Sequence, residues 1–484
     1  MPLDCSRPAL LEERMSCLSR TLVLLVAVAI AIPQSHAALR AGTAIVDITP
    51  KEWPLPLRGA FHPRIVDSAR DPLRVRSLVL DDGKTTIALA LVDSCMVHRE
   101  VLDPAKEQIS KATGIAEANI MVCATHTHSA PFSNAIHDTP EERAYQKLLL
   151  AGIVESVSSA AGNRQAATIG WGSHELTDEV FNRRWHLKAG KMPANPFGSK
   201  KDKVKMNPPR SADVLDRPAG PTDPEVSVLY LKDERGRPLS VFANYSLHYV
   251  GNTGPQASAD YFGEFARLMQ HRLPQRAGNF VAMLSNGTSG DINNINFRNP
   301  RPRRAVFEQI GVVASKTADA ATHAIKGITK TAGEVKLTMR QREITLKHRV
   351  PSGELLERAK KILETPLKPS ERNTLERIYA QRTLELAKLA PDTRVIVQAI
   401  RIGDLGICTL PFEVLVEIGL ELKKKSPAGD TFVVELANGA YGYLPTPQQH
   451  ELGGYETWLG TNKVQLDASE ILVGNLLEML DELF

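Results

Sequence analysis

The stretch Asn119-Ile-Met-Val-Cys-Ala-Thr-His-Thr-His-Ser-Ala-Pro131 joins an apolar run to two histidines, His126 and His128. A short apolar run of this kind predicts a buried β-strand. On an extended chain residues i and i+2 point to the same side, so both imidazoles are expected to face one pocket. Open α/β sheets place their sites at the carboxyl ends of strands, although two unrelated surface histidines would produce the same short motif by chance.

Strand and helix patterns alternate around this stretch, which predicts an α/β (mixed α+β) fold with a mixed sheet. Residues 195–224 have no periodicity and predict a long surface loop. Charged helical residues at 351–390, broken at Pro366 and Pro369, predict a helical hairpin inserted in the domain. Predicted strands cover 44–50, 74–80, 85–93, 119–124, 167–171, 226–231, 239–245, 279–284, 394–402 and 405–410, and further helices cover 99–113, the residues after 139, 259–271, 304–324 and 467–484.

The composition is that of a globular enzyme, because 43% of the 484 residues are hydrophobic and 24% are charged. The formal net charge is only +4 and the basic residues are dispersed, so no nucleic-acid partner is expected.

Of five cysteines, Cys5 and Cys17 precede the predicted mature chain. The other three, Cys95, Cys123 and Cys408, lie in apolar runs, so no disulfide framework is expected.

Residues 1–37 have the pattern of a signal peptide. An apolar run from Thr21 to Ile32 follows Arg20, and small residues, Ser35 and Ala37, precede the predicted cleavage before Ala38. A membrane anchor is the alternative, but spanning a bilayer requires roughly 20 apolar residues. The sequence therefore predicts a secreted or periplasmic protein whose domain covers 38–484, and Met15 would give the more usual start.

Three more side chains could bind a metal. His248 follows the predicted strand at 239–245, and Glu413 follows the strand at 405–410, where the first turn of a helix is expected. Tyr443 lies in a loop rich in Gly and Pro. A structural histidine and a carboxylate that favours a helix N-terminus are the ordinary alternatives, and spacing alone does not unite residues so distant in sequence.

The order of these motifs between Ala41 and Trp458 resembles the neutral/alkaline ceramidase family. The shared motifs are Ala-Thr-His-Thr-His-Ser-Ala-Pro, an Asn-Arg, a strand-end His, a Gly-Asp loop, Pro-x-Glu and Asn…Tyr-x-Tyr. The resemblance implies a Zn²⁺ site and hydrolysis of the amide bond of a small-molecule or lipid substrate such as a sphingolipid, with peripheral membrane contact. The implied zinc ligands are His126, His248, Glu413 and Tyr443; His128 would transfer protons, and Arg183 and Tyr455 would hold the scissile carbonyl.

One motif departs from the family pattern. Ceramidases usually have Gly-Asp-Val-Ser-Pro-Asn where this chain has Gly290-Asp-Ile-Asn293-Asn-Ile295. An amide cannot act as a nucleophile but can donate a hydrogen bond, so Asn293 favours a route in which zinc lowers the pKa of water to about 7. The family's C-terminal β-sandwich is not expected in this chain, and an ester substrate is an alternative to an amide.

Two other classes of protein are alternatives. An amidohydrolase-like barrel also places His-x-His at a strand end, but it needs further strand-end histidines that this sequence lacks. A non-catalytic exported metal-binding protein on the same fold is the second.

Three other features carry no catalytic prediction. Asp93 and Asp260 are expected in turns or caps, and the sequon at Asn286 is expected to be structural. The sequence gives no indication of an oligomeric state.

Overall fold

The fold is built on a mixed eight-stranded sheet. The computed structural model describes residues 38–273, 276–367 and 373–484, so the predicted signal peptide lies outside the described residues. The two edge pairs of the sheet are parallel and the five pairs between them are antiparallel. In spatial order the strands are β14 (Val281–Asn286), β13 (Pro238–Tyr245), β12 (Glu225–Asp233), β7 (Gln165–Glu175), β1 (Arg40–Asp47), β4 (Arg74–Asp81), β5 (Thr86–Val92) and β6 (Ile120–Ala124).

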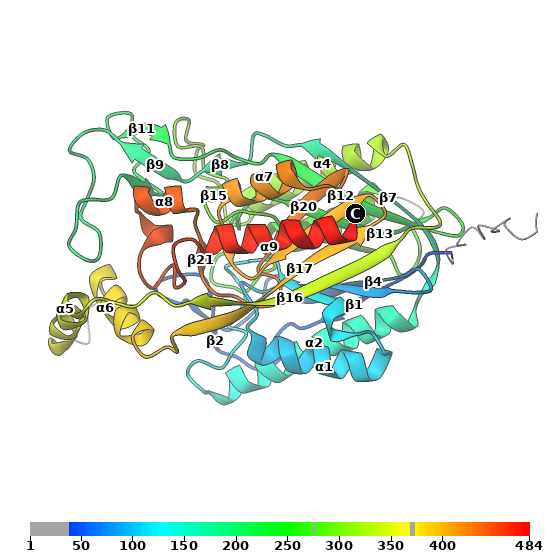
Figure 1. The fold of residues 1–484 in the computed structure, drawn as a ribbon, viewed down its shortest axis with the longest axis horizontal. Helices are drawn as coiled ribbons and strands as arrows, with labels where there is room; N and C mark the ends of the chain where they lie inside the picture. Colours follow the sequence, from blue (N-terminus) through cyan, green and yellow to red (C-terminus); the bar gives the residue numbers. More distant parts are fainter. Residues whose placement is uncertain (1–37, 274–275, 368–372) are drawn as a thin grey trace, which may run out of the picture. The chain divides into compact units, whose positions relative to one another are not determined.

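A four-stranded sheet packs against one face of the large sheet (Figure 1). Its order is β16 (Leu337–Lys347), β17 (Asp392–Ile402), β18 (Leu405–Leu410) and β20 (Asp430–Glu435), with β18 and β20 parallel. Side chains alternate between faces along each strand, so Leu89 of β5 and Ile407 of β18 meet in the core between the sheets. The strands β5, β6, β14 and β18 are covered on both faces, so they are buried along nearly their whole length.

Helices cover the two outer faces. The helices α1 (Arg99–Thr113), α2 (Pro140–Gly162), α3 (Asp260–Arg272) and α4 (Glu308–Gly327) pack on the large sheet. The helices α7 (Val416–Lys425) and α9 (Ala468–Leu483) pack on the small sheet. The result is an α/β/β/α arrangement of layers. A closed barrel of eight parallel strands is therefore excluded, and with it the amidohydrolase-like barrel.

Local signals fixed several element boundaries correctly. Gly114 adopts φ 75° at the C-terminus of α1, and the Thr139 side chain accepts a hydrogen bond from Glu142 N before Pro140 begins α2. The predicted hairpin consists of α5 (Gly353–Glu364) and α6 (Leu375–Leu386). The strands β17 and β18 pair across the turn at Gly403, as the sequence predicted.

The prediction that residues 195–224 form only a loop was wrong. Within them, β10 (Val204–Met206) and β11 (Leu215–Pro218) pair on either side of β9 (Arg184–Leu187) in a small sheet. These strands are short and lack the alternation that identifies longer strands, so the pattern did not reveal them.

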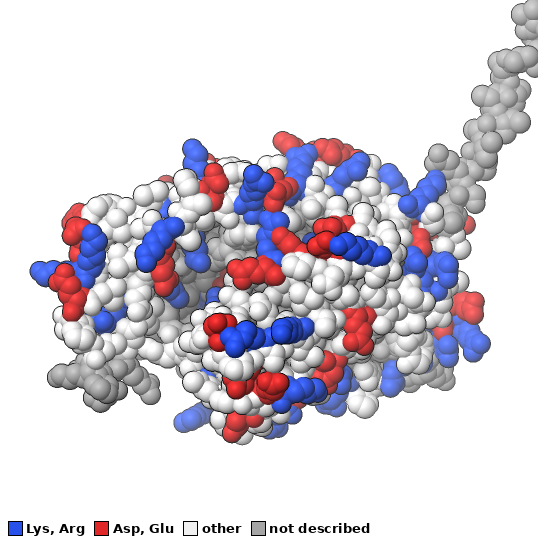
Figure 2. All heavy atoms as spheres, turned by 90° about the horizontal axis from the view of Figure 1, so that it is seen from below, with Lys and Arg blue, Asp and Glu red and all other residues white. Residues whose placement is uncertain are grey.

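Lys, Arg, Asp and Glu intermingle on the face drawn in Figure 2, in keeping with the small net charge.

Candidate metal centre and active site

The histidines predicted from sequence meet where carboxyl ends of strands from both sheets come together. His126 follows β6, His248 follows β13, and Glu413 follows β18. Nε2 of His126 lies 3.1 Å from Nε2 of His248 and 3.2 Å from Nε2 of His128. The Glu413 Oε2 atom lies 3.2 Å from His126 Nε2 and 4.0 Å from His248 Nε2. The structure thus brings together side chains that are separated by almost three hundred residues of sequence.

His126 and His128 lie together, with their Nε2 atoms 3.2 Å apart, but the reason given in the sequence analysis was wrong. His126 is not extended: its φ of 69° lies in the left-handed region, which is uncommon for a residue other than glycine. The backbone N–H of His126 donates to Ser94 O, which fixes this conformation after β6 has ended. The strained residue therefore lies in the centre of the site, where such strain is commonly found.

Glu413 and Tyr443 are held as neighbours by their backbones. They are register partners in a parallel pair formed by β19 (Glu413–Val414) and β21 (Tyr443–Leu444). The expectation that Glu413 begins a helix was wrong, since α7 starts at Val416. Tyr443 likewise lies in a short strand rather than only in a loop. Backbone pairing between distant segments is not readable from either segment alone.

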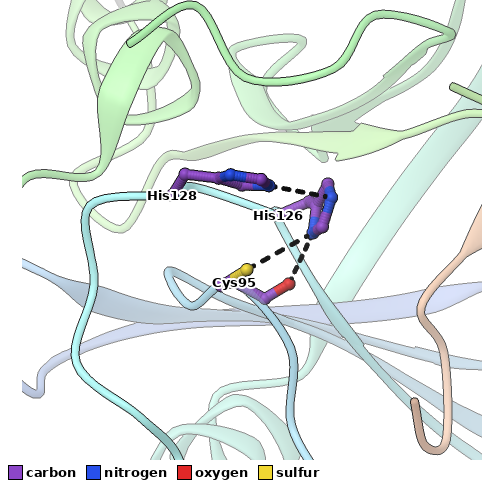
Figure 3. A group of neighbouring side chains, drawn as sticks. All are labelled: Cys95, His126 and His128. Atoms are coloured by element: carbon purple, nitrogen blue, oxygen red, sulfur yellow. Dashed lines mark hydrogen bonds between the residues drawn. The ribbon is translucent and has the colours of Figure 1, made fainter. Parts of the chain in front are cut away.

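Backbone carbonyls orient both central histidines. Nδ1 of His126 lies 2.7 Å from the carbonyl oxygen of Cys95 (Figure 3), and Nδ1 of His248 lies 3.1 Å from the carbonyl oxygen of Ser289. A histidine that donates from Nδ1 presents Nε2 as the free ligand atom, which is the usual arrangement in metal sites. The Cys95 thiol lies 3.7 Å from the same Nδ1, on the side of His126 away from Glu413.

Arg183 and Tyr455 lie at the same site, beside Tyr443. Nη2 of Arg183 donates to the Tyr443 hydroxyl at 2.9 Å and to Gly290 O at 2.7 Å. The buried Glu456 carboxylate accepts from Arg183 Nε and holds the guanidinium in place. The rings of Tyr443 and Tyr455 meet edge to face with centroids 5.4 Å apart. Arg183 and two phenol groups therefore lie together next to the Glu413 carboxylate.

Sequence reasoning missed a second layer of polar groups. The Glu435 carboxylate accepts from Ser289 Oγ at 2.7 Å and from Val414 N at 2.8 Å. Ser289 Oγ is 3.3 Å from His248 Nδ1, so Glu435 is linked both to His248 and to the residue next to Glu413. A signal existed: Glu435 interrupts the apolar run Phe432-Val-Val-Glu-Leu436, where a carboxylate is rare unless it has partners.

Asn293 makes its contacts away from the histidine cluster. Its Nδ2 donates to Asn207 Oδ1 at 2.7 Å and its Oδ1 accepts from Ile295 N at 2.9 Å. It lies in β15 (Ile292–Asn293), which pairs with β8 (Phe181–Asn182), the strand that precedes Arg183. These contacts give Asn293 a role in shaping the loop around Arg183, while a direct role in chemistry stays a prediction.

The remaining polar candidates have structural surroundings. Asp93 forms a buried ion pair with Arg76 at 2.7 Å. Asp260 begins α3 and accepts hydrogen bonds from Val250 N and Gly251 N, so it stabilises the turn before the helix. The Asn286 side chain of the sequon is fully buried. Cys95, Cys123 and Cys408 are buried free thiols.

The site is arranged to hold positive charge. Burial disfavours the charged form of His126, but the Cys95 thiol and the Glu413 carboxylate outweigh this and raise its pKa well above the usual value. Burial, followed by the positive charge on His126, holds the pKa values of His128 and His248 well below theirs. The Nε2 atoms of His126 and His248 and the Glu413 carboxylate thus face one another in a buried site.

The residues fit a divalent metal of the zinc type. Glu413 Oε2 is buried and has no hydrogen-bond partner among the described residues. The ligand atoms of His126, His248 and Glu413 lie within 4.8 Å of one another. Two imidazole nitrogens and a carboxylate oxygen are a usual catalytic zinc set, with further positions for a phenol or water. A cation at this point would satisfy the unpaired carboxylate oxygen.

The fold and this cluster define a class: mixed α/β proteins with a buried group of metal-ligating side chains at the carboxyl ends of their strands. Comparison with known proteins identifies the family, because the model of the "Neutral/alkaline non-lysosomal ceramidase, N-terminal" family matches residues 40–371. The chain belongs to this family, as the resemblance in its sequence predicted.

Relatives and solved structures agree with this assignment. The chain is 27% identical over 269 residues to neutral ceramidase B of Dictyostelium discoideum, and 26% identical over 242 residues to neutral ceramidase of Pseudomonas aeruginosa. These matches cover 52% and 46% of this chain but only 35% and 32% of the relatives. The crystal structure of the Pseudomonas aeruginosa enzyme superposes with a TM-score of 0.71 at 18% identity, covering 92% of this chain and 74% of that one. A ceramidase complexed with C2 gives 0.70 at 17% identity, covering 92% and 75%. At these identities the superpositions show the shared fold.

Proposed function

We propose that this chain is an exported zinc-dependent hydrolase that cleaves the amide bond of an N-acyl compound. The observation that carries the proposal is the buried Glu413 Oε2, which has no hydrogen-bond partner among the described residues and faces two imidazole nitrogens. A buried unpaired carboxylate oxygen is costly, so a site of this kind is best explained by a bound cation. His126, His248, Glu413 and Tyr443 would hold it.

Zinc bound there would supply a Lewis acid and lower the pKa of water to about 7. The chain's own residues would provide the other requirements of acyl transfer. Arg183, fixed by Glu456, and the hydroxyl of Tyr455, whose ring packs on Tyr443, would donate hydrogen bonds to the oxyanion that develops on the scissile carbonyl. Such donors must be preorganised to be effective, and the ion pair of Arg183 provides this order.

His128 is suited to move a proton. Burial, followed by the positive charge on His126, lowers its pKa, so the imidazole is uncharged near neutral pH and a ring nitrogen is free to act as a general base. The ring is fixed by stacking on Tyr249, with centroids 3.7 Å apart and an interplanar angle of 15°. We propose that His128 takes the proton of the attacking water and returns it to the leaving amine. The chain's Asn293 supports a route without a serine nucleophile.

Export would follow from cleavage before Ala38. Among the described residues, no helix combines the length and the apolar character needed to span a bilayer. Secretion in a bacterial host, followed by mass measurement of the mature N-terminus, tests the proposal. A mature chain that begins at Ala38 is expected, whereas retention of residues 1–37 on a membrane-bound product would contradict export.

The enzyme proposal is tested by metal analysis together with hydrolysis assays on N-acyl and O-acyl substrates, ceramide included. We expect about one zinc per chain, turnover of an N-acyl substrate, and loss of both in His126→Ala, because removing a ligand disrupts metal binding itself. His323→Ala, at an exposed histidine on α4, is the matched control. Bound zinc without turnover on any substrate would instead indicate a non-catalytic binding protein.

A further inference from the structure

One side of the site carries three cationic side chains, Arg58, Arg382 and Lys463, named the rim cations below. No carboxylate of a described residue lies within 4.0 Å of any of them; the hydrogen bond that Arg58 donates goes to the Met96 sulfur at 3.4 Å. The buried arginines Arg76 and Arg183 differ from the rim cations, because each forms an ion pair with a buried carboxylate. The rim therefore has positive charge that no described residue neutralises through a direct ion pair.

Arg58 lies beside the histidine proposed to transfer protons. The backbone of the next residue, Gly59, packs so closely on the His128 ring that a Cβ atom there would be 2.4 Å away. The Arg58 guanidinium lies over the Phe132 ring, 4.8 Å from its centroid, which keeps the side chain in place without neutralising it. Arg58 is half-buried, so its charge is less hydrated than that of a surface arginine.

Arg382 reaches the site from α6. Its guanidinium lies 5.1 Å from the Tyr379 ring centroid and 5.5 Å from that of Phe61. Phe61 in turn packs edge to face on Tyr455, with centroids 5.7 Å apart. One aromatic ring therefore separates Arg382 from a residue proposed to hold the scissile carbonyl.

Lys463 completes the rim. It follows Asn462, whose side chain donates to Tyr443 O at 3.0 Å, so its backbone is tied to the metal site. Gly460, three residues before Lys463, packs on the Arg382 side chain, where an added Cβ would be 2.9 Å from the Arg382 Cβ, and Arg382 lies over Phe61, three residues after Arg58. Loss of hydration, followed by the charges of Arg58 and Arg382, lowers the pKa of Lys463, and the Glu385 carboxylate opposes this effect. Like charges held together repel, and an anion between them would remove this cost.

From this geometry we infer that the substrate carries an anionic group on its amine fragment, as in an N-acyl amino acid, and that the rim cations bind it. The inference rests on the proposed function. The amine side is indicated because Gly59, the residue after Arg58, packs on His128, which would deliver the proton to the leaving amine. A carboxylate a few bonds from the scissile nitrogen would thus meet the rim while the carbonyl meets Arg183 and Tyr455.

Binding and turnover of two soluble substrates test this separately. N-octanoylglycine and N-octanoylethanolamine share the acyl chain and differ in the charge of the amine fragment. With the zinc-loaded protein, titration calorimetry is expected to show about tenfold tighter binding of N-octanoylglycine at low salt, with the preference falling as salt is added. Equal binding, or tighter binding of the neutral compound, would overturn the inference whether or not either is hydrolysed.

Substitutions identify the residues responsible. Arg58→Gln, Arg382→Gln and Lys463→Gln are each expected to reduce the binding preference by about threefold to tenfold, with the ratio of kcat/KM for the two substrates falling in parallel. Arg235→Gln, at an exposed arginine in the turn between β12 and β13, should leave the preference unchanged. If the substitutions weaken only sedimentation with anionic phosphatidylglycerol vesicles and leave the preference intact, the rim binds membrane and the inference is wrong. Selective binding without turnover would retain the rim assignment and reject the hydrolase.

Discussion

Oε2 of Glu413 lies 3.2 Å from Nε2 of His126, and no described residue donates a hydrogen bond to that oxygen. The pair joins the end of β18 to the end of β6, strands of different sheets. The other ring nitrogen of His126 is hydrogen-bonded to a backbone carbonyl, so Nε2 and the Glu413 oxygen are two ligand atoms directed at the same point. A metal ion bound there would satisfy both atoms.

Glu413→Gln should therefore weaken zinc binding by at least about 100-fold, because an amide oxygen carries no charge and is a poor zinc ligand. Competition with a chromogenic chelator measures the change. Glu175→Gln, at an exposed carboxylate at the end of β7, is the control and should bind zinc like the unmodified protein. Unchanged zinc affinity in Glu413→Gln would place the metal elsewhere.

Tyr455→Phe should lower kcat by about 10²–10³-fold while the zinc content stays at one per chain, because it removes an oxyanion donor and not a ligand. The control is Tyr441→Phe, whose hydroxyl donates to Arg394 O outside the cluster. If Tyr455→Phe lost zinc along with activity, the residue would belong to the coordination sphere rather than to carbonyl binding.

Glu435 should strengthen zinc binding indirectly, by holding Ser289 against the zinc ligand His248. Glu435→Gln and Ser289→Ala both disturb the contact with His248 Nδ1, and each is expected to weaken zinc affinity about 10- to 100-fold. Combining them should cost little more than the stronger single change, since both act on one network. A purely structural role would lower the melting temperature of the metal-free protein and leave zinc affinity unaltered.

Lys106 should make stability depend on pH. Burial lowers its pKa to about 7, and its ammonium donates to Asn438 Oδ1 at 2.6 Å. The unfolded chain binds this proton up to about pH 10.4, so the folded state is penalised below pH 7 and the penalty fades as pH rises from 7 to 10.

The check is urea unfolding of the unmodified protein and Lys106→Met between pH 6 and 9. The free energy of unfolding of the unmodified protein should rise by about 2–4 kcal/mol relative to that of the variant over this range. Lys330→Met, at an exposed lysine in the loop after α4, is the control and should follow the unmodified protein. Parallel curves for Lys106→Met would show that the ammonium stays charged in the fold.

Local patterns predicted most of the elements because their causes lie within a few residues. The helix α1 covers Arg99–Thr113, the range that the sequence predicted, and side chains of β5 alternate between two cores. The short strands β10, β11, β19 and β21 were not predicted, since two to four residues carry too little periodicity. For the same reason Glu413 was assigned to a helix.

By itself the sequence determined the mixed α/β class, the positions of the main elements and, through the order of its motifs, the family. Only the tertiary structure decided that His126 is left-handed, that Glu413 pairs with Tyr443, that Glu435 supports His248 and that the rim cations lack carboxylate partners among the described residues. Backbone periodicity is a property of neighbours along the chain, whereas coordination and charge balance depend on atoms brought together from distant segments.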